Sequence, residues 1–188
     1  KSAFPTRQIY RIPSNYKFFL FERMENENSP EANDTIVKKM KDGIFTIEHI
    51  MPQTLTPQWK EELGENWQQI YDAYLHTFAN LTLTGFNTSY SNHSFQEKKD
   101  GYTDRKGNKI NGFKNSAFCL SNYLKQCSKW TIDEIKERQQ ILLENFLRLW
   151  PMIQTEYVPL EKEYELVSFD DDEYELSWRQ IIGYRYRN

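Results

Sequence analysis

The sequence predicts an α+β fold that is mainly α-helical, and three observations lead to this class. A capping box opens a long amphipathic stretch at residues 131–150, which is typical of a surface helix. Two short β-branched runs, at residues 44–47 and 81–84, have the length and composition of strands. Most other segments carry helix-start signals or helical spacing of apolar residues. We therefore expect a small β-hairpin embedded in a helical domain.

Local signals place four helices and one strand in the first half of the chain. The expected elements are helices at about residues 15–26, 35–41, 57–63 and 66–78 and a strand at residues 44–47. Ser14 is a candidate N-cap for the first helix, and Asp42-Gly43 is a turn that leads into the strand. Thr56-Pro57 has the form of an N-cap followed by a first-turn proline, which favours a helix directly after it.

The second half of the chain continues the hairpin and contains the longest helix. The expected elements are a strand at residues 81–84, helices at about residues 87–99 and 116–125, and the long helix at residues 131–150. Residues 100–112 are rich in Gly, Asn and Lys, so we expect a mobile loop there. Thr131 and Glu134 form the capping box of the long helix, and its apolar stripe runs to Trp150.

Charge divides the chain into two parts. Residues 1–151 carry 20 Lys and Arg against 18 Asp and Glu, whereas residues 152–188 carry 4 against 9. We expect the first part to be the functional domain, with a helical N-terminal segment, and the second to be an acidic appendage. Residues 164–169 and 173–176 flank three consecutive aspartates, so the appendage resembles a β-hairpin with an acidic turn.

One constellation of polar residues surrounds the expected hairpin. Glu48 and His49 end the first strand, Asn80 precedes the second strand, and Asn87 opens the helix after it. If the strands pair and that helix packs across them, Glu48, His49 and Asn87 occupy one small volume. An asparagine donates and accepts hydrogen bonds at once, so Asn80 is suited to hold the strands or His49 in register.

This mixture of side chains suits the hydrolysis of a phosphodiester bond. A neutral imidazole can take a proton from a nucleophilic water near neutral pH, which makes His49 a candidate general base. A divalent ion stabilises charge on the phosphorane and on the leaving oxygen. The carboxylate of Glu48 and the amide of Asn87 offer the hard oxygen ligands that suit Mg²⁺ or Mn²⁺. The sequence therefore predicts a metal-assisted site.

Seven motifs in the chain resemble, in their order, those of a known family. They are Glu48-His49-Ile50-x-Pro52, Asn80-Leu81-Thr82-Leu83, Asn87, Phe95-x-x-Lys98, Ser116, Trp130 and Ile135-x-x-Arg138. Together they resemble the GmrSD-type C-terminal HNH domain, a His-Me finger nuclease with a ββα-metal core, over roughly residues 20–151. The resemblance implies His49 as the catalytic general base and Asn80 as the catalytic-site asparagine that organises the hairpin. It implies Glu48 and Asn87 as metal-site residues.

The resemblance also implies partners and a biological role. Family members often carry an upstream domain that binds or hydrolyses nucleotides, and they act in restriction of modified or foreign DNA. The chain begins at Lys1 without an initiating methionine, so we expect a fragment from which such a domain is missing. The resemblance further implies that Lys98 and Arg138 support the site or the DNA. Ala79 stands where the family usually has a glycine, a departure that affects the turn.

A basic segment follows the candidate site. Residues 93–130 carry 8 Lys and Arg against 3 Asp and Glu. Lys98, Lys99 and Lys114 in this segment are candidate nucleic-acid contacts or supports of the site. A DNA backbone would bind such a surface with an affinity that falls steeply with salt. We therefore expect DNA as the partner, and a solvated loop of mixed charge is the alternative.

Composition limits the remaining classes of protein. The chain has neither a run of about 18 apolar residues nor a basic segment followed by an apolar one, so we expect no membrane span and no signal peptide. Cys119 and Cys127 lack the spacing of a zinc site, and we expect a cytoplasmic protein. The predicted function is a divalent-metal-dependent DNA endonuclease or nickase that serves restriction or phage defence. A nucleic-acid-binding or protein-interaction module without catalysis is the alternative.

Overall fold

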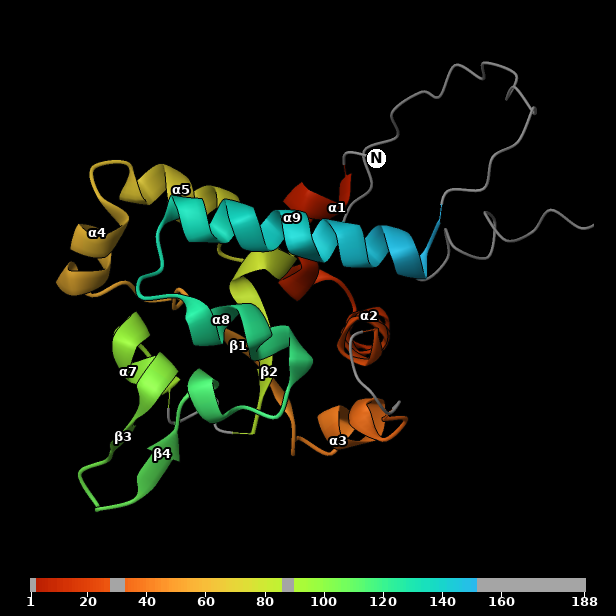
Figure 1. Cartoon of the computed structure of the whole chain (residues 1–188), viewed down its shortest axis with the longest axis horizontal. Coiled ribbons are helices and arrows are strands. Elements are labelled where there is room, and N and C mark those ends of the chain that lie inside the picture. Colours follow the sequence, from red (N-terminus) through yellow and green to blue (C-terminus); the bar gives the residue numbers. More distant parts are fainter. Residues whose placement is uncertain (1–2, 28–32, 86–89, 152–188) are drawn as a thin grey trace, which may run out of the picture. The chain divides into compact units, whose positions relative to one another are not determined.

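The computed structural model describes residues 3–27, 33–85 and 90–151, which belong to a unit that spans residues 1–152. This part of the chain is mainly α-helical and contains two small antiparallel sheets of two strands each (Figure 1). The predicted α+β class is therefore confirmed. The acidic appendage at residues 152–188, with its expected β-hairpin, lies outside the described residues.

The four predicted helices of the first half occur in the predicted order with shifted ends, and a short helix that was not predicted precedes them. They are α1 (Ala3–Thr6), α2 (Ser14–Asn26), α3 (Ile36–Lys41), α4 (Pro57–Leu63) and α5 (Trp67–Tyr74), with the 3-10 turns η1 (Ile9–Arg11) and η2 (Phe78–Asn80). The predicted cap of α2 is wrong, because Pro13 holds the N-cap and Ser14 already belongs to the helix. Thr56 caps α4 as predicted, since its hydroxyl accepts a hydrogen bond from the backbone N–H of Trp59. The helix expected to run to residue 78 ends at Tyr74.

The predicted hairpin strands are β1 (Thr46–His49) and β2 (Leu81–Thr84), which pair antiparallel. β1 begins two residues later than expected and includes Glu48 and His49. The register places Glu48 opposite Thr82 and His49 opposite Leu81. Neighbouring residues of a strand point to opposite faces, so Glu48 and His49 serve different sides of the pair. The His49 side packs into an apolar cluster built from α2, α3 and α9 (Ile132–Leu149), and Glu48 lies on the other side.

The second half departs most from expectation between residues 87 and 125. Its elements are α7 (Phe95–Asp100), β3 (Gly101–Thr103), β4 (Lys109–Asn111), η3 (Phe113–Asn115), η4 (Cys119–Ser121), α8 (Asn122–Gln126) and α9. α7 begins late because Ser94 and Glu97 form a capping box, and residues 86–89 lie outside the described part. The predicted helix at residues 116–125 is divided into η4 and α8.

The segment expected to be a mobile loop is a β-hairpin. β3 and β4 pair antiparallel, and Asp104 closes the turn between them. The carboxylate of Asp104 accepts hydrogen bonds from the backbone N–H of Lys106 and of Asn108, each at 2.8 Å. At the base of the hairpin, a Cβ on Gly101 or Gly112 would collide with neighbouring backbone, so the two chains approach closely there. We name this element the basic hairpin, because Arg105, Lys106 and Lys109 are exposed on it.

Arg138 ties α9 to the segment that leads into β2. Its guanidinium is buried and donates hydrogen bonds to the carbonyl oxygens of Phe78, Ala79, Leu81 and Leu120 at 2.5–3.1 Å. Burial lowers the pKa of Arg138 to about 9, which keeps the side chain charged at neutral pH. Arg138 therefore supports the hairpin from within the protein, the first of the two roles expected for it.

We predict that Arg138→Met destabilises the fold by about 3–5 kcal/mol, because buried carbonyl groups lose a charged donor. Urea unfolding measures this loss, and Lys136→Met, an exposed position on the same helix, is the control with an expected change within about 0.5 kcal/mol. A loss below about 1 kcal/mol for Arg138→Met would show that the carbonyl groups find other partners.

Candidate active site

A cavity of about 330 Å³ lies where β1 ends. Its lining residues come from β1, the turn after it, η1 and the chain before α7; they are Tyr10, Ile47, Glu48, His49, Pro52, Gln53, Thr54, Ser91 and Asn92. Glu48 and His49 thus share one cavity although their side chains leave opposite faces of the strand. Ser91 has a φ of 41°, a left-handed conformation that is uncommon for residues other than glycine.

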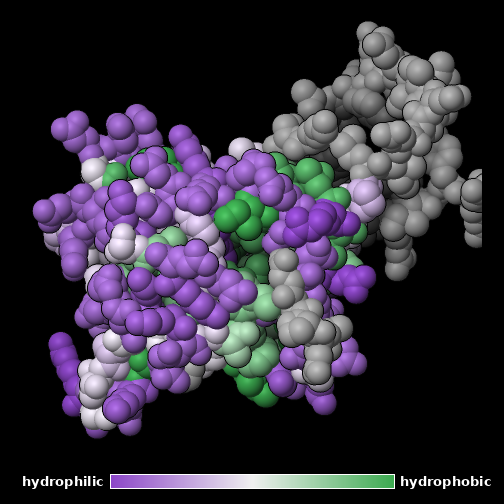
Figure 2. Space-filling model, in the orientation of Figure 1, coloured by the Kyte–Doolittle hydropathy of each residue, from purple (hydrophilic) through white to green (hydrophobic). Residues whose placement is uncertain are grey.

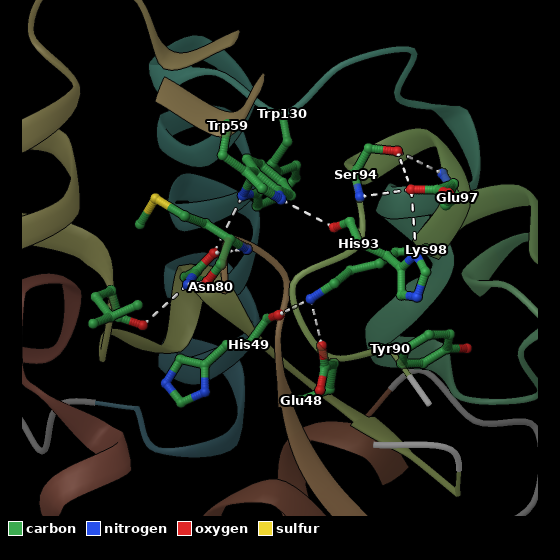
Figure 3. A network of polar contacts seen from close by, with 12 residues as sticks. Glu48, His49, Trp59, Asn80, Tyr90, His93, Ser94, Glu97, Lys98 and Trp130 are labelled. Carbon is green, nitrogen blue, oxygen red and sulfur yellow. Dashed lines mark hydrogen bonds and ion pairs between the residues drawn. The ribbon is translucent and has the colours of Figure 1, made fainter. Parts of the chain in front are cut away.

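Lys98 forms a buried polar contact at this site. Its ammonium group donates to Oε1 of Glu48 at 2.6 Å and to the backbone carbonyl of His49 at 2.8 Å. Figure 3 shows Lys98 reaching from α7 to the end of β1, with Glu48 and the His49 carbonyl before it. Lys98 is 0% exposed. Of the two roles expected for Lys98, its position matches support of the site.

Burial disfavours the ionised form of both Glu48 and Lys98. Loss of water raises the pKa of Glu48 to about 7, against the attraction of the Lys98 ammonium, which lowers it. The same burial lowers the pKa of Lys98, against the effect of the carboxylate. Each charge therefore depends on its partner, because an isolated charge in this environment is unfavourable.

His49 lies against a second histidine, His76, which follows α5. The Nε2 atom of His49 is 3.1 Å from the Nδ1 atom of His76. Tyr10 of η1 covers both rings, stacked on His76 and edge-on to His49. Figure 3 shows the His49 ring directed away from Lys98 and Glu48. Burial, followed by His76, Lys98 and Lys17, lowers the pKa of His49 to about 3, so the imidazole is neutral at pH 7.

Asn80 holds the turn that follows β1. Its side-chain oxygen accepts from the backbone N–H of Met51 at 2.8 Å and from Nε1 of Trp130 at 3.2 Å. Its amide nitrogen donates to the carbonyls of Met51 and Leu75 at 2.9 and 3.0 Å. These four bonds use the full capacity of the amide, and Asn80 is 0% exposed. Asn80 therefore acts on the site by positioning backbone.

The described residues offer a limited set of metal ligands. They contain no group of three or more His, Cys, Asp and Glu side chains arranged to hold an ion. Glu48 contributes a carboxylate to the cavity wall, and Asn87, the other predicted metal-site residue, lies outside the described part. Mg²⁺ is commonly bound by one or two carboxylates while it keeps several waters, and Glu48 fits that mode.

The other predicted nucleic-acid contacts lie near the basic hairpin. Lys99 is half-buried at the end of α7, and Lys114 is exposed on η3. Neither Tyr10 nor His76 was predicted to be a site residue. His76 has no motif around it, and Tyr10 precedes the segment over which the family motifs run. The spacing of residues carried no signal for either one.

The fold and this site define a class: a mainly α-helical α+β domain that presents a neutral histidine and a carboxylate at the end of a β-hairpin. Residues 1–145 match the family described as GmrSD restriction endonucleases, C-terminal domain, and the chain belongs to this family. The family makes it a nuclease domain with a role in restriction, and it confirms the resemblance seen in the sequence. No curated protein matches the chain. None of the described helices has the length and apolar character needed to cross a membrane.

We predict that His49 makes the metal-free protein sensitive to acid. Its pKa is about 3 in the folded state against an ordinary value of 6.5, so between these values the unfolded chain binds a proton that the folded chain does not. The stability from neutral His49 is present above pH 6.5 and is lost as the pH falls toward 3. Between pH 7 and 4.5, the free energy of unfolding of the wild type should fall by about 2–3 kcal/mol more than that of His49→Leu.

Urea unfolding in EDTA at the two pH values measures this difference. The raised pKa of Glu48 acts in the opposite direction, and Glu48 is present in both proteins, so the comparison isolates His49. Equal losses in both proteins would mean that His49 is solvated enough to keep its ordinary pKa.

Proposed function

We propose that the chain is a divalent-metal-dependent DNA endonuclease domain of the HNH type, the effector part of a restriction or phage-defence protein. The observation that supports this proposal most is that His49 and Glu48 line one cavity at the end of a hairpin. A general base and a metal-binding carboxylate must reach the same phosphate, and the shared cavity is large enough to hold a phosphate group.

His49 would accept the proton of the attacking water. A pKa of about 3 leaves the imidazole neutral at physiological pH, but it makes the isolated group a weak base. A bound phosphodiester brings negative charge into the cavity, and negative charge favours the imidazolium form. Substrate binding would therefore raise the pKa of His49 toward the range in which proton transfer is efficient.

Glu48 and Asn87 would hold Mg²⁺ or Mn²⁺, which supplies stabilisation of the charge on the phosphorane and the leaving oxygen. Lys98 favours the ionised form of the Glu48 carboxylate against the effect of burial and fixes it in place, because its ammonium lies 2.6 Å away in a buried position. Lys98 donates its hydrogen bond to the Oε1 atom of Glu48. One such site cuts one strand in each event, so nicking, or a double cut by two copies, is the expected product.

The basic hairpin and its neighbours are the proposed DNA-binding surface. Arg105, Lys106 and Lys109 are exposed on the hairpin, and Lys114 is exposed just beyond it. The hairpin continues directly from α7, the helix that carries Lys98 into the site. Figure 2 shows that the face over α7, β3 and β4 is predominantly hydrophilic. Phosphates bound here would lie next to the helix that supports the cavity.

We predict that the chain nicks supercoiled plasmid with millimolar Mg²⁺ or Mn²⁺ and that EDTA abolishes nicking. His49→Ala should lower the rate about 10²–10⁴-fold, the usual contribution of a general base. Glu48→Gln should also lose activity, and the loss should shrink as the metal concentration rises, because the variant removes a ligand. His93→Ala is the matched control, since His93 is a half-buried histidine outside the lining of the cavity. Equal rates for wild type and His49→Ala would contradict the proposal.

We predict that Arg105→Ser, Lys106→Ser and Lys109→Ser together weaken DNA binding and lower the dependence of log K on log salt by about 3, one for each lost phosphate contact. Binding is measured in EDTA over a salt series. The control replaces Lys38, Lys41 and Lys136, which are exposed on α3 and α9, by Ser. If the hairpin variant and the control showed the same dependence of log K on log salt, the DNA would bind to another part of the protein.

A binding module without catalysis is the second candidate. It is favoured by one observation, that Glu48 and His49 both have partners within the protein, Lys98 and His76. For such a module, we expect salt-sensitive DNA binding that His49→Ala leaves intact. We also expect no nicking under any metal condition. The plasmid experiment decides between the two.

A further inference from the structure

We propose that His76 is the positioning residue of the general base: it fixes the orientation and tautomer of His49 so that Nδ1 is the nitrogen left to receive the proton of water. This inference rests on the proposed nuclease function. It starts from the 3.1 Å contact between Nε2 of His49 and Nδ1 of His76. Nothing in the motifs that carry the family resemblance includes His76.

The two rings are held in a fixed mutual geometry. Their centroids are 5.3 Å apart, and their planes meet at 75°. Tyr10 stacks on His76 with 5.5 Å between centroids and an angle of 11°, and it meets His49 edge-on at 4.4 Å. The backbone N–H of Tyr10 donates to the carbonyl of His76 at 3.1 Å. His76 is therefore fixed at both its ring and its backbone.

Tyr10 is itself held in place by α2. The ammonium of Lys17 donates to the carbonyl of Tyr10 at 2.7 Å and lies 4.8 Å from the centre of its ring. A chain of contacts thus runs from α2 through η1 to His76 and His49. Positioning residues of this kind are useful because a base must hold its reactive nitrogen toward the substrate before the substrate arrives.

The contact carries one proton between two nitrogens, which restricts the tautomer of His49. If His76 donates from Nδ1, then Nε2 of His49 is the acceptor and Nδ1 of His49 carries the proton. The neutral His49 then has no free nitrogen to act as a base. If His49 donates from Nε2, its Nδ1 has a free lone pair. The second arrangement is the one that allows catalysis, and it requires His76 to carry its own proton on Nε2.

This arrangement becomes stronger when His49 is protonated. The imidazolium would donate from Nε2 to a neutral acceptor, and charge-assisted hydrogen bonds are roughly twice as strong as neutral ones. Burial, followed by the charge of Arg11, lowers the pKa of His76, so the acceptor stays neutral. Histidines that act in metal sites often have a carboxylate or a carbonyl as this second partner. Here a neutral histidine takes that place.

The test compares nicking by wild type, His76→Leu and His76→Asn. His76→Leu fills the space without an acceptor, and kcat should fall about 10–100-fold, the usual cost of losing such a partner, with KM unchanged. His76→Asn retains an oxygen acceptor near the position of Nδ1, and its kcat should return to within about threefold of wild type. His93→Leu is the matched control and should leave kcat unchanged. Thermal unfolding establishes that each variant is folded.

A double-mutant cycle separates positioning from a structural role. In a His49→Ala background, His76→Leu should cause no further loss, because the residue that it positions is gone. A further loss as large as in wild type would overturn the proposal, as would an unchanged kcat for His76→Leu or a failure of His76→Asn to restore it.

Nitrogen-15 NMR of the histidine rings gives a readout that does not depend on cleavage. In the wild-type protein in EDTA, the shifts should show the proton of His49 on Nε2 and a free Nδ1, and His76→Leu should yield a mixture of both tautomers. A proton found on Nδ1 of His49 in wild type would overturn the positioning role. The absence of metal-dependent nicking by wild type would overturn the proposed function instead, so the two failures are distinguishable.

Discussion

The ion pair between Lys98 and Glu48 is the interaction on which the arrangement of the site depends. It joins α7 to β1 across 50 residues of sequence, with Lys98 fully buried and Glu48 almost fully buried at the cavity wall. Such a pair is stabilising only if each charge has further partners, because desolvation of two ions is costly. The carbonyl of His49 provides one, as the second acceptor of the Lys98 ammonium. One lysine therefore fixes the carboxylate of Glu48 and the backbone of the proposed base together.

Two further polar side chains hold the irregular backbone around this pair. Asn80 forms four hydrogen bonds, to Met51, Leu75 and Trp130. Arg138 donates hydrogen bonds to carbonyl groups of η2, β2 and η4. Turns and 3-10 segments leave backbone groups without regular partners, and buried groups of this kind must be satisfied. The strands are short, so side chains supply much of the order that a larger sheet would supply by itself. The resulting scaffold keeps Glu48 and His49 at one cavity.

Local signals in the sequence were sufficient for the hairpin strands, the capped helix α4 and the long helix α9, and the family motifs predicted Glu48, His49 and Asn80 as candidate site residues. The basic hairpin was missed because three-residue strands are too short to show alternation, and its Gly and Asn residues are typical of loops. The burial of Lys98 had a usable signal, since Phe95 three residues earlier lies on the same helical face. The role of His76 had none, because it depends on a contact between residues 27 apart that only the folded chain creates.

We propose that Glu48 and His49 form one metal-assisted centre at the end of the hairpin. The most direct test is a crystal structure of His49→Ala bound to a short DNA duplex with Mn²⁺, in which anomalous scattering locates the ion. We expect an anomalous peak in direct contact with the Glu48 carboxylate, a phosphate oxygen on the same ion, and the Lys98 ammonium still beside Glu48. A peak away from Glu48, or DNA that leaves the cavity empty, would contradict it.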